Sequence, residues 1–427
     1  MADLVPFRGV RYRGDDRGDI SSVIAPPYDV ISAAQQDALY ARSPYNVIRL
    51  EYSRERAPER YALAARELAA WRESSGPLLT EPQPALYRYT QRFQHDGHTY
   101  ERTALIGRVK LEPIERGVIR PHEYTMAKPK EDRLALLQAT RTNISPVYSL
   151  LDDADDRFST ALRGAPVTER TSGVDLVGQS HDLEVITDRR SLEQLSECLR
   201  GRPLYIADGH HRYETALAYQ TEHPDDPAAA YVLMAVSAAG DPGLLILPIH
   251  RLVRPRTPNP NLEARLLDVF DLEDAGGIED DQAVRTLAER LHASTDELTL
   301  GAIGVRAGRL LRLRLRDRAA VEAAMPAERT PAWQHLAVNV LQFGVLEPML
   351  GIDAAALESG ENVEFSEDAI EAAGAVRQGT VPFAFLVPAT RTDELIAVAD
   401  AGDRMPQKST YFYPKLGTGL VLNAHDA

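Results

Sequence analysis

Two periodicities of apolar residues divide the first half of the chain into predicted helices and strands. From residue 54 to residue 71, apolar side chains recur every three or four positions, which predicts an amphipathic helix. Residues 84–93 and 98–111 are predicted strands, and the Asp96-Gly97 pair between them is a strong hairpin signal. Further apolar runs predict strands over 145–151, 183–187, 203–207, 229–236 and 244–249, and short helices over 131–140 and 191–199.

The composition of the chain changes after His250. Residues 254–260 hold three prolines and are a predicted linker. Helices then alternate with strands, so the whole chain is predicted to have a mixed α/β (α+β) fold with two regions, an N-terminal one over 1–253 and a C-terminal one over 254–427. In the C-terminal region helices are predicted over 261–270 and 281–293, a long apolar helical stretch within 331–350, and strands over 298–305, 310–315, 381–387 and 418–422. The two regions are expected to pack on one site. The stretch 152–180 is acidic and irregular at its start, and is expected to be a connection or an excursion from the fold.

Length and charge limit the classes of function. A chain of 427 residues is too long for one typical core, so two or three domains are expected. The net charge of −15, from 48 basic and 63 acidic residues, repels a nucleic-acid backbone. The sequence has no apolar run of about 18 residues and no secretory signal, which predicts a cytoplasmic protein without a membrane span. A single cysteine, Cys198, excludes an internal disulfide.

The densest polar cluster is Asp-Gly-His-His-Arg at 208–212, directly after the predicted strand 203–207. Gly209 permits a tight turn, and His210, His211 and Arg212 then open a helix, where unpaired N–H groups and the helix dipole favour an anion. Arg212 adds a planar charge suited to phosphate. The alternative is that the histidines only cap a structural turn. The density of polar residues favours a phosphate site in which Asp208 and His211 are candidate catalytic groups.

A second cluster, over 119–133, lies between a predicted strand and a helix. Glu123 is a candidate general base and His122 a candidate acid or base. Lys128, Lys130 and Arg133 are candidates to neutralise phosphate oxygens. A solvated loop of mixed charge is the alternative for this segment.

A third cluster, over 405–415, combines lysines, hydroxyl groups and tyrosines. Lys408 is its candidate phosphate ligand, and an edge strand with its turn is the alternative. Residues 25–29, Ala-Pro-Pro-Tyr-Asp, form a rigid loop that either faces a ligand or caps the next helix.

Several sequence motifs of known enzyme classes are missing, which argues against those classes. The sequence contains no P-loop, no Gly-x-Gly-x-x-Gly dinucleotide motif and no Gly-x-Ser-x-Gly nucleophile elbow. His210 and His211 are adjacent, so they point to different sides of a helix and do not grip one metal together. A metal held by His211, Asp208 and a distant carboxylate stays open.

Five segments together resemble the domain of unknown function 1015 family over nearly the whole chain. They are 25–32 (Ala-Pro-Pro-Tyr-Asp-Val-Ile-Ser), 46–51 (Asn-Val-Ile-Arg-Leu-Glu), 120–125 with 130–134, 207–216 and 405–415. The turn at 208–212 is also similar, more distantly, to the phosphate-binding signature of the ParB/sulfiredoxin superfamily. That superfamily includes nucleotide-binding partitioning proteins, sulfiredoxin and a kinase for free serine. The resemblance implies a ParB/sulfiredoxin-like core with additional N-terminal and C-terminal elements.

Departures from this superfamily narrow the expected function. His210 stands where sulfiredoxin has its reactive cysteine, and the chain shows no helix-turn-helix, so the serine kinase is the member that fits. The expectation is phosphotransfer on a small hydroxylated metabolite, with serine or phosphoserine as the best guess and ATP or ADP with Mg²⁺ as the cofactor. Glu123, or alternatively Asp208, would take the proton. The rival expectations are a nucleotide-binding regulator without catalysis and a scaffold without a ligand.

Overall fold

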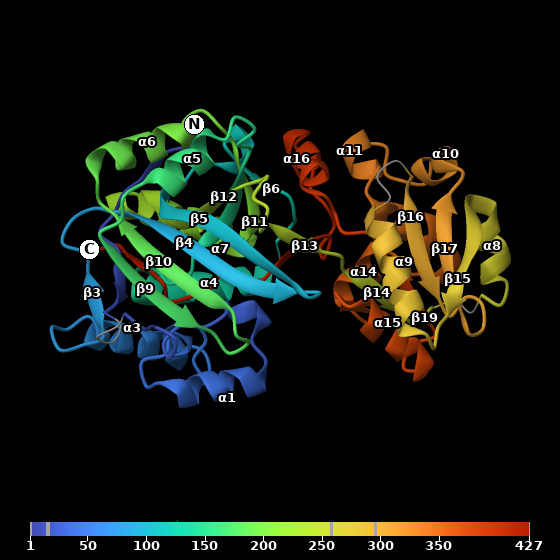
Figure 1. The fold of residues 1–427 in the computed structure, drawn as a ribbon, viewed down its shortest axis with the longest axis horizontal. Coiled ribbons are helices and arrows are strands. Elements are labelled where there is room, and N and C mark those ends of the chain that lie inside the picture. The colour runs from blue at the N-terminus through green and yellow to red at the C-terminus, as the bar shows by residue number, and fades with distance from the viewer. Residues whose placement is uncertain (1, 14–17, 126, 257–258, 294–296, 427) are drawn as a thin grey trace. The chain divides into compact units, whose positions relative to one another are not determined.

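The computed structural model describes residues 2–13, 18–125, 127–256, 259–293 and 297–426, without the side chains of 127–128 and 358–359 (Figure 1). The chain forms two compact units, and both combine helices with β-sheet, so the predicted mixed α/β fold is confirmed. The first unit consists of Met1–Pro121, Thr125–Leu245 and Pro414–Ala427, and the second of His122–Tyr124 and Ile246–Tyr413.

The first unit is built on a nine-stranded sheet with the order β6-β11-β8-β12-β5-β4-β10-β9, and β1 pairs with β5. These strands are β1 (Leu4–Val5), β4 (Leu86–His95), β5 (His98–Lys110), β6 (Ile119–Pro121), β8 (Val147–Leu151), β9 (Glu169–Val174), β10 (Ser180–Ile186), β11 (Leu204–Asp208) and β12 (Tyr231–Ala238). Two short ladders lie beside it: β2 (Val10–Tyr12) with β3 (Leu78–Thr80), and β7 (Thr142–Asn143) with β21 (Asn423–Ala424).

The predicted hairpin is the centre of this sheet. His95 pairs with His98 across a two-residue loop, and both loop residues have positive φ, 47° at Asp96 and 76° at Gly97. Such a loop matches the right-handed twist of the flanking strands. The hairpin prediction is confirmed, and the two long strands give the sheet its framework.

Helices cover the sheet of the first unit. An apolar cluster joins one sheet face to α5, α6 and α7, with Leu105, Val147, Leu204 and Met234 fully buried. The helical elements are η1 (Tyr28–Val30), α1 (Ala33–Arg42), α2 (Ile48–Glu51), α3 (Glu59–Trp71), η2 (Ile114–Arg116), α4 (Ala127–Thr140), α5 (Arg157–Gly164), α6 (Arg189–Leu199), α7 (His210–Glu222) and η3 (Pro227–Ala230). Helix α4 packs against α7, which brings Lys130 of the predicted second cluster beside the helix that follows the first cluster.

The second unit is built on a six-stranded sheet with the strand order β15-β17-β16-β19-β14-β18. Its strands are β14 (His250–Val253), β15 (Phe270–Gly277), β16 (Thr299–Ile303), β17 (Arg309–Leu315), β18 (Val363–Ser366) and β19 (Phe383–Leu386), and β13 (Leu245–Leu247) pairs with β20 (Tyr411–Tyr413). Its helical elements are α8 (Leu262–Val269), α9 (Asp281–Ala293), α10 (Arg318–Glu322), α11 (Pro331–Gln334), α12 (Ala337–Leu341), the π-turn η4 (Gln342–Leu346), α13 (Glu347–Leu350), α14 (Ala354–Ser359), α15 (Ala369–Arg377) and α16 (Thr392–Asp400).

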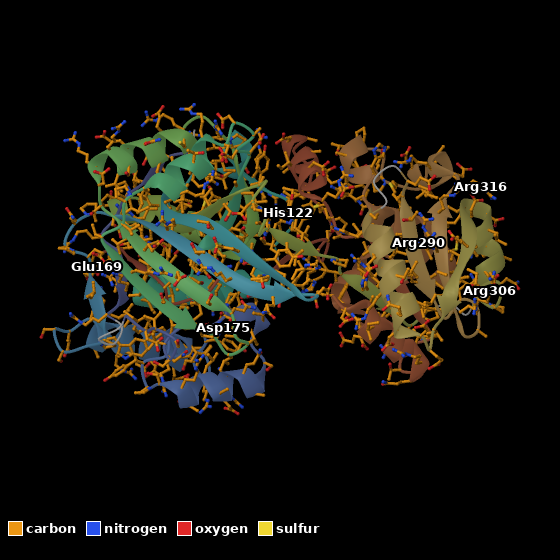
Figure 2. The ribbon with its side chains drawn as sticks, in the orientation of Figure 1. His122, Glu169, Asp175, Arg290, Arg306 and Arg316 are labelled. Carbon is orange, nitrogen blue, oxygen red and sulfur yellow. The ribbon has the colours of Figure 1, made fainter. Side chains whose placement is uncertain are left out.

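Two exposed arginines of the second unit pair with acidic side chains of β15 and α8. Arg290 of α9, labelled in Figure 2, bonds Glu273 of β15, and Arg306, also labelled, bonds Glu263 of α8. These pairs are exposed, so each contributes little to stability.

The sequence predictions of secondary structure outside the clear strands and helices have mixed outcomes. The stretch 331–350 does contain a long helical stretch, because α12, η4 and α13 follow one another without a break, and only α11 is separated from them, at the extended residue Leu336. There the side chain of Asn339 donates to the carbonyl oxygen of Trp333 at 2.6 Å. The stretch 152–180 is irregular at its start and then holds α5 and β9. The strand predicted over 418–422 is wrong, because these residues form only isolated bridges.

The predicted linker over 254–260 lies partly outside the described residues, at 257–258. Arg254 and Arg256, which precede that gap, donate backbone hydrogen bonds to Asn362 and Leu350 and are therefore integrated in the second unit. Within the described part of the chain, none of the helices is both long and apolar enough to cross a bilayer.

Candidate functional site

The candidate site begins where β11 ends. Strand β11 is buried between β6 and β8, and α7 starts two residues after it, so the predicted strand, turn and helix are confirmed. Gly209 is the N-cap of α7 with φ of 90°, a conformation that a side chain would strain. A Cβ atom at Gly209 would lie 2.9 Å from Nε of Arg212. Glycine therefore lets the guanidinium of Arg212 lie directly against the turn.

Asp208 holds two cations at the start of α7. One of its carboxylate oxygens bonds Arg212 and the other bonds Lys415. Burial alone would raise the pKa of Asp208, but Lys415 and Arg212 outweigh it and hold this pKa well below its usual range. Asp208 is thus ionised at neutral pH. The three side chains carry one net positive charge beside the N–H groups of a 13-residue helix.

Lys415 is the site residue that sequence reasoning missed. It lies in the third cluster, 405–415, but Lys408 was the predicted phosphate ligand. The structure instead fixes the segment around Lys415 in the first unit, where Arg102 donates to the carbonyl oxygen of Pro414 at 2.7 Å and Gln91 to that of Lys415 at 3.1 Å. The 207 positions between Lys415 and Asp208 carry no local pattern that predicts this pair.

The two histidines of the turn have different surroundings. His210 is buried and His211 is half-buried. Burial lowers the pKa of His211, the cations Lys130 and Arg212 act in the same direction, and Glu214 and Asp29 act against them. An imidazole with a pKa below 6.5 is neutral at pH 7 and is able to accept a proton.

Helix α4 brings further predicted residues into the first unit. Lys130 forms an ion pair with Glu214 of α7 at 3.0 Å. Arg133 is buried, bonds Asp132 and Glu51, and stacks on the ring of Tyr28 at 4.0 Å. The side chain of Lys128, another predicted ligand, lies outside the described residues. The guanidinium of Arg133 is therefore bonded to protein groups in the interior, whereas the side chain of Lys130 is partly exposed.

His122, Glu123 and Lys408 belong to the second unit, where the loop around 122 meets the segment 405–411. The backbone N–H of Met405 donates to the carbonyl oxygen of His122 at 2.7 Å. Nε2 of His122, labelled in Figure 2, lies 2.9 Å from Oγ1 of Thr410, and this hydroxyl donates to Oε1 of Glu123 at 3.4 Å. The second and third sequence clusters thus converge here.

A buried cation completes this cluster of the second unit. Arg251 donates to the carbonyl oxygen of Lys408 at 3.0 Å. Burial lowers the pKa of Arg251 to about 10, and the negative charge of Glu123 opposes this shift. Arg251 remains protonated at neutral pH and fixes the backbone of Lys408, which has a positive φ of 61°.

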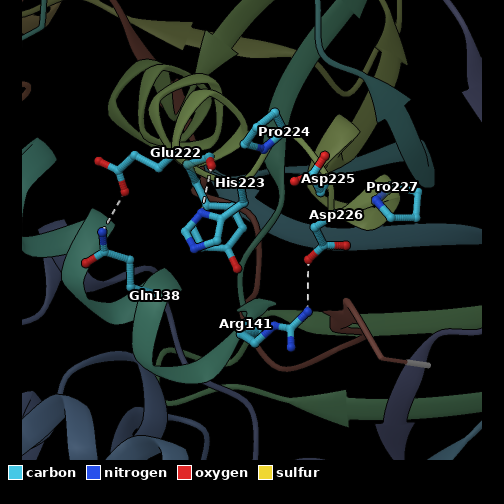
Figure 3. Close-up of a pocket in the computed structure, with 9 residues that line it drawn as sticks. Gln138, Arg141, Glu222, His223, Pro224, Asp225, Asp226 and Pro227 are labelled. Carbon is cyan, nitrogen blue, oxygen red and sulfur yellow. Dashed lines mark hydrogen bonds and ion pairs between the residues drawn. The ribbon is translucent and has the colours of Figure 1, made fainter.

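A cavity of about 620 Å³ lies at the other end of α7 (Figure 3). Its polar side chains pair with one another: Gln138 donates to Glu222 at 2.7 Å and Arg141 to Asp226 at 2.9 Å. It contains none of the residues predicted from the sequence, so the candidate site is placed at the start of α7, where the cations converge. Among the described residues, no group of three His, Cys, Asp or Glu side chains is arranged to hold a metal ion.

The fold and this turn define a mixed α/β protein with a positively charged turn between a buried strand and a helix. The chain belongs to the family described as protein of unknown function DUF1015, whose model matches residues 4–336. No curated protein sequence matches the chain.

Solved structures show weak similarity to the chain. Free serine kinase in complex with AMP is 10% identical with a TM-score of 0.36, over 72% of this chain and 86% of that chain. A conserved hypothetical protein from Pyrococcus furiosus is 11% identical with a TM-score of 0.32, over 73% and 93%. A C-terminally truncated SbnI from Staphylococcus aureus is 13% identical with a TM-score of 0.31, over 72% and 84%.

Proposed function

We propose that this protein transfers phosphoryl groups to or from a small hydroxylated metabolite, with serine or phosphoserine as the best candidate. The observation that carries this proposal is the convergence of Arg212 and Lys415 on Asp208 at the N-terminus of α7. Two cations with one carboxylate leave a net positive charge where N–H groups already point outward. This is the arrangement that stabilises the charge of a transferring phosphoryl group.

Each residue of the turn has one role in the proposed reaction. The N–H groups after Gly209, with Arg212 and Lys415, hold the phosphate oxygens. Asp208 positions both cations and, because its pKa is so low, accepts no proton. His211, neutral at pH 7, takes the proton of the attacking hydroxyl as the new O–P bond forms and the O–P bond to the leaving group breaks.

Nucleotide and substrate complete the proposal. ATP or ADP with Mg²⁺ would supply the phosphoryl group. With water as the attacking group, the same residues would hydrolyse phosphoserine. The resemblance of 208–212 to the phosphate-binding turn of the ParB/sulfiredoxin superfamily supports a phosphate at this turn.

The experiment is to incubate the purified protein with serine and ATP or ADP, and separately with phosphoserine, while phosphorus NMR follows the phosphate species. Turnover in any combination supports the proposal, and Arg212→Ala is then expected to reduce it. Arg163→Ala, on an exposed arginine of the same unit, is the matched control. Glu123→Gln in the same assay tests the sequence prediction that Glu123 is the proton acceptor.

Two other results would replace the proposal. Tight nucleotide binding by calorimetry without turnover over hours would identify a nucleotide-binding regulator. The absence of binding to nucleotide, phosphate or phosphoserine, together with unchanged behaviour of Arg212→Ala, would leave a structural role for the turn.

A further inference from the structure

A second cavity in the first unit adjoins the cationic turn. It has a volume of about 50 Å³, and Arg212 lines it together with Glu51 and Arg133. Its remaining lining combines apolar with uncharged polar residues: Leu136, Leu137, Ile144 and Val232, and Thr142, Asn143, Ser145 and Thr215. The volume admits only a few non-hydrogen atoms, so the cavity is far too small for a nucleoside.

Glu51 presents an unused oxygen in this cavity. Its carboxylate is only 3% exposed, and it lies at the end of the segment 46–51 that the proposed reaction does not employ. Among the described residues, the hydrogen bonds to this carboxylate, from Ser145 at 3.0 Å and from Arg133 at 3.4 Å, both end at Oε1. Oε2 is therefore available to a donor that enters the cavity.

Arg133 forms an ion pair with Glu51 on one carboxylate oxygen only. The guanidinium of Arg133 directs Nε and Nη2 to Asp132, and reaches Oε1 of Glu51 through Nη1 at 3.4 Å. Asp132 also has Arg60 as a second cation. A charged donor on Oε2 would add a second ionised hydrogen bond to this carboxylate, and such bonds are about twice as strong as neutral ones.

We infer that the cavity holds the amino end of the substrate, with an ammonium group on Oε2 of Glu51 and the phosphate on Arg212. The inference rests on the proposed phosphotransfer function and narrows its substrate class to small amino compounds that bear a phosphorylatable hydroxyl. The apolar side chains of the wall contact the two carbon atoms between these groups. Glu51 is then the residue that distinguishes an amine from a neutral alcohol.

The test compares two ligands that differ in one group: O-phosphoserine carries an ammonium where 3-phosphoglycerate carries a hydroxyl. Calorimetry on the full-length wild-type protein is expected to show at least tenfold tighter binding of O-phosphoserine. In Glu51→Gln the two affinities should converge to within about twofold, while binding of 3-phosphoglycerate stays near its wild-type value. A thermal melt of the variant checks that it is folded.

The possible outcomes separate the two proposals. Equal affinities of the wild-type protein for the two ligands, both weakened by Arg212→Ala, would overturn the role of Glu51 and leave the phosphate site intact. Binding of neither ligand would instead count against the proposed function. If Glu51→Gln does not fold, the wild-type comparison alone decides, because it requires no variant.

Discussion

Gly209→Ala is the most direct perturbation of the cationic turn. The residue has φ of 90°, so an alanine pays the penalty of the left-handed region, roughly 1–2 kcal/mol of folding stability. The new Cβ would also lie 2.9 Å from Nε and 3.0 Å from Cζ of Arg212, closer than real Cβ atoms approach other groups. The guanidinium must move away from the turn.

The movement of Arg212 predicts a loss of anion affinity on top of the loss of stability. If the shift removes one charge-assisted hydrogen bond to phosphate, binding weakens by about 1.5–3 kcal/mol, which corresponds to roughly 10- to 100-fold in Kd. Calorimetric titration with ADP or inorganic phosphate measures this change, and urea unfolding measures the stability change separately.

Gly178→Ala is the matched control for this prediction. Gly178 lies between β9 and β10 with φ of 84°, and a Cβ there meets nothing within 4 Å. Its alanine variant should lose similar stability while binding the anion with wild-type affinity. Unchanged anion binding in Gly209→Ala, or an equal loss in both variants, would refute the assignment of the turn as the phosphate site.

Three further predictions follow from the same turn. Arg212→Ala should lower kcat/KM for phosphotransfer by about 2 kcal/mol or more, on the order of 30-fold, and a rate within twofold of wild type would contradict its contact with the transferring group. The pKa of Asp208 is lower in the folded protein than in the unfolded one, so its ionised carboxylate stabilises the fold above the unfolded-state pKa, and this stabilisation is lost as pH falls below about 4. Asp208→Asn should therefore flatten the acid side of a profile of unfolding free energy against pH, measured by urea unfolding, and an unchanged slope would argue against the ion pairs. His211 has a lowered pKa, so turnover should decline on acidification only below pH 6.5. His211→Gln should lower kcat roughly 10²- to 10⁴-fold, and a wild-type pH profile in that variant would show that His211 is not the proton acceptor.

Sequence analysis predicts best those elements whose backbone conformation is set by neighbouring residues in the sequence. Asp96-Gly97 specifies a tight hairpin by its own backbone preference, and the structure forms β4 and β5 around it. The run from Leu204 to Ala207, followed by Gly209, likewise specifies a strand, a turn and a helix. In both cases a few consecutive residues determine the geometry, so no tertiary information is needed.

Predictions fail where tertiary contacts override the local pattern. The apolar stretch 331–350 has helical periodicity throughout and is helical over 337–350, yet Leu336 is extended and Asn339 bonds back to Trp333, so α11 is a separate helix. The periodicity of apolar residues indicates which positions are buried, but not where the backbone changes direction. A buried side-chain hydrogen bond that ends a helix therefore leaves no trace in that pattern.

The candidate site shows the same limit in its chemistry. The turn at 208–212 is visible in the sequence because its polar residues are consecutive, whereas Lys415, which bonds Asp208, and Glu51, which lines a cavity with Arg212, are far from it in the sequence. Lys408 and Lys415 stand in one polar segment, but the chain passes from the second unit to the first between residues 413 and 414. Only the fold distinguishes the lysine that neutralises Asp208 from the one that does not, because the pairing depends on which unit anchors each backbone.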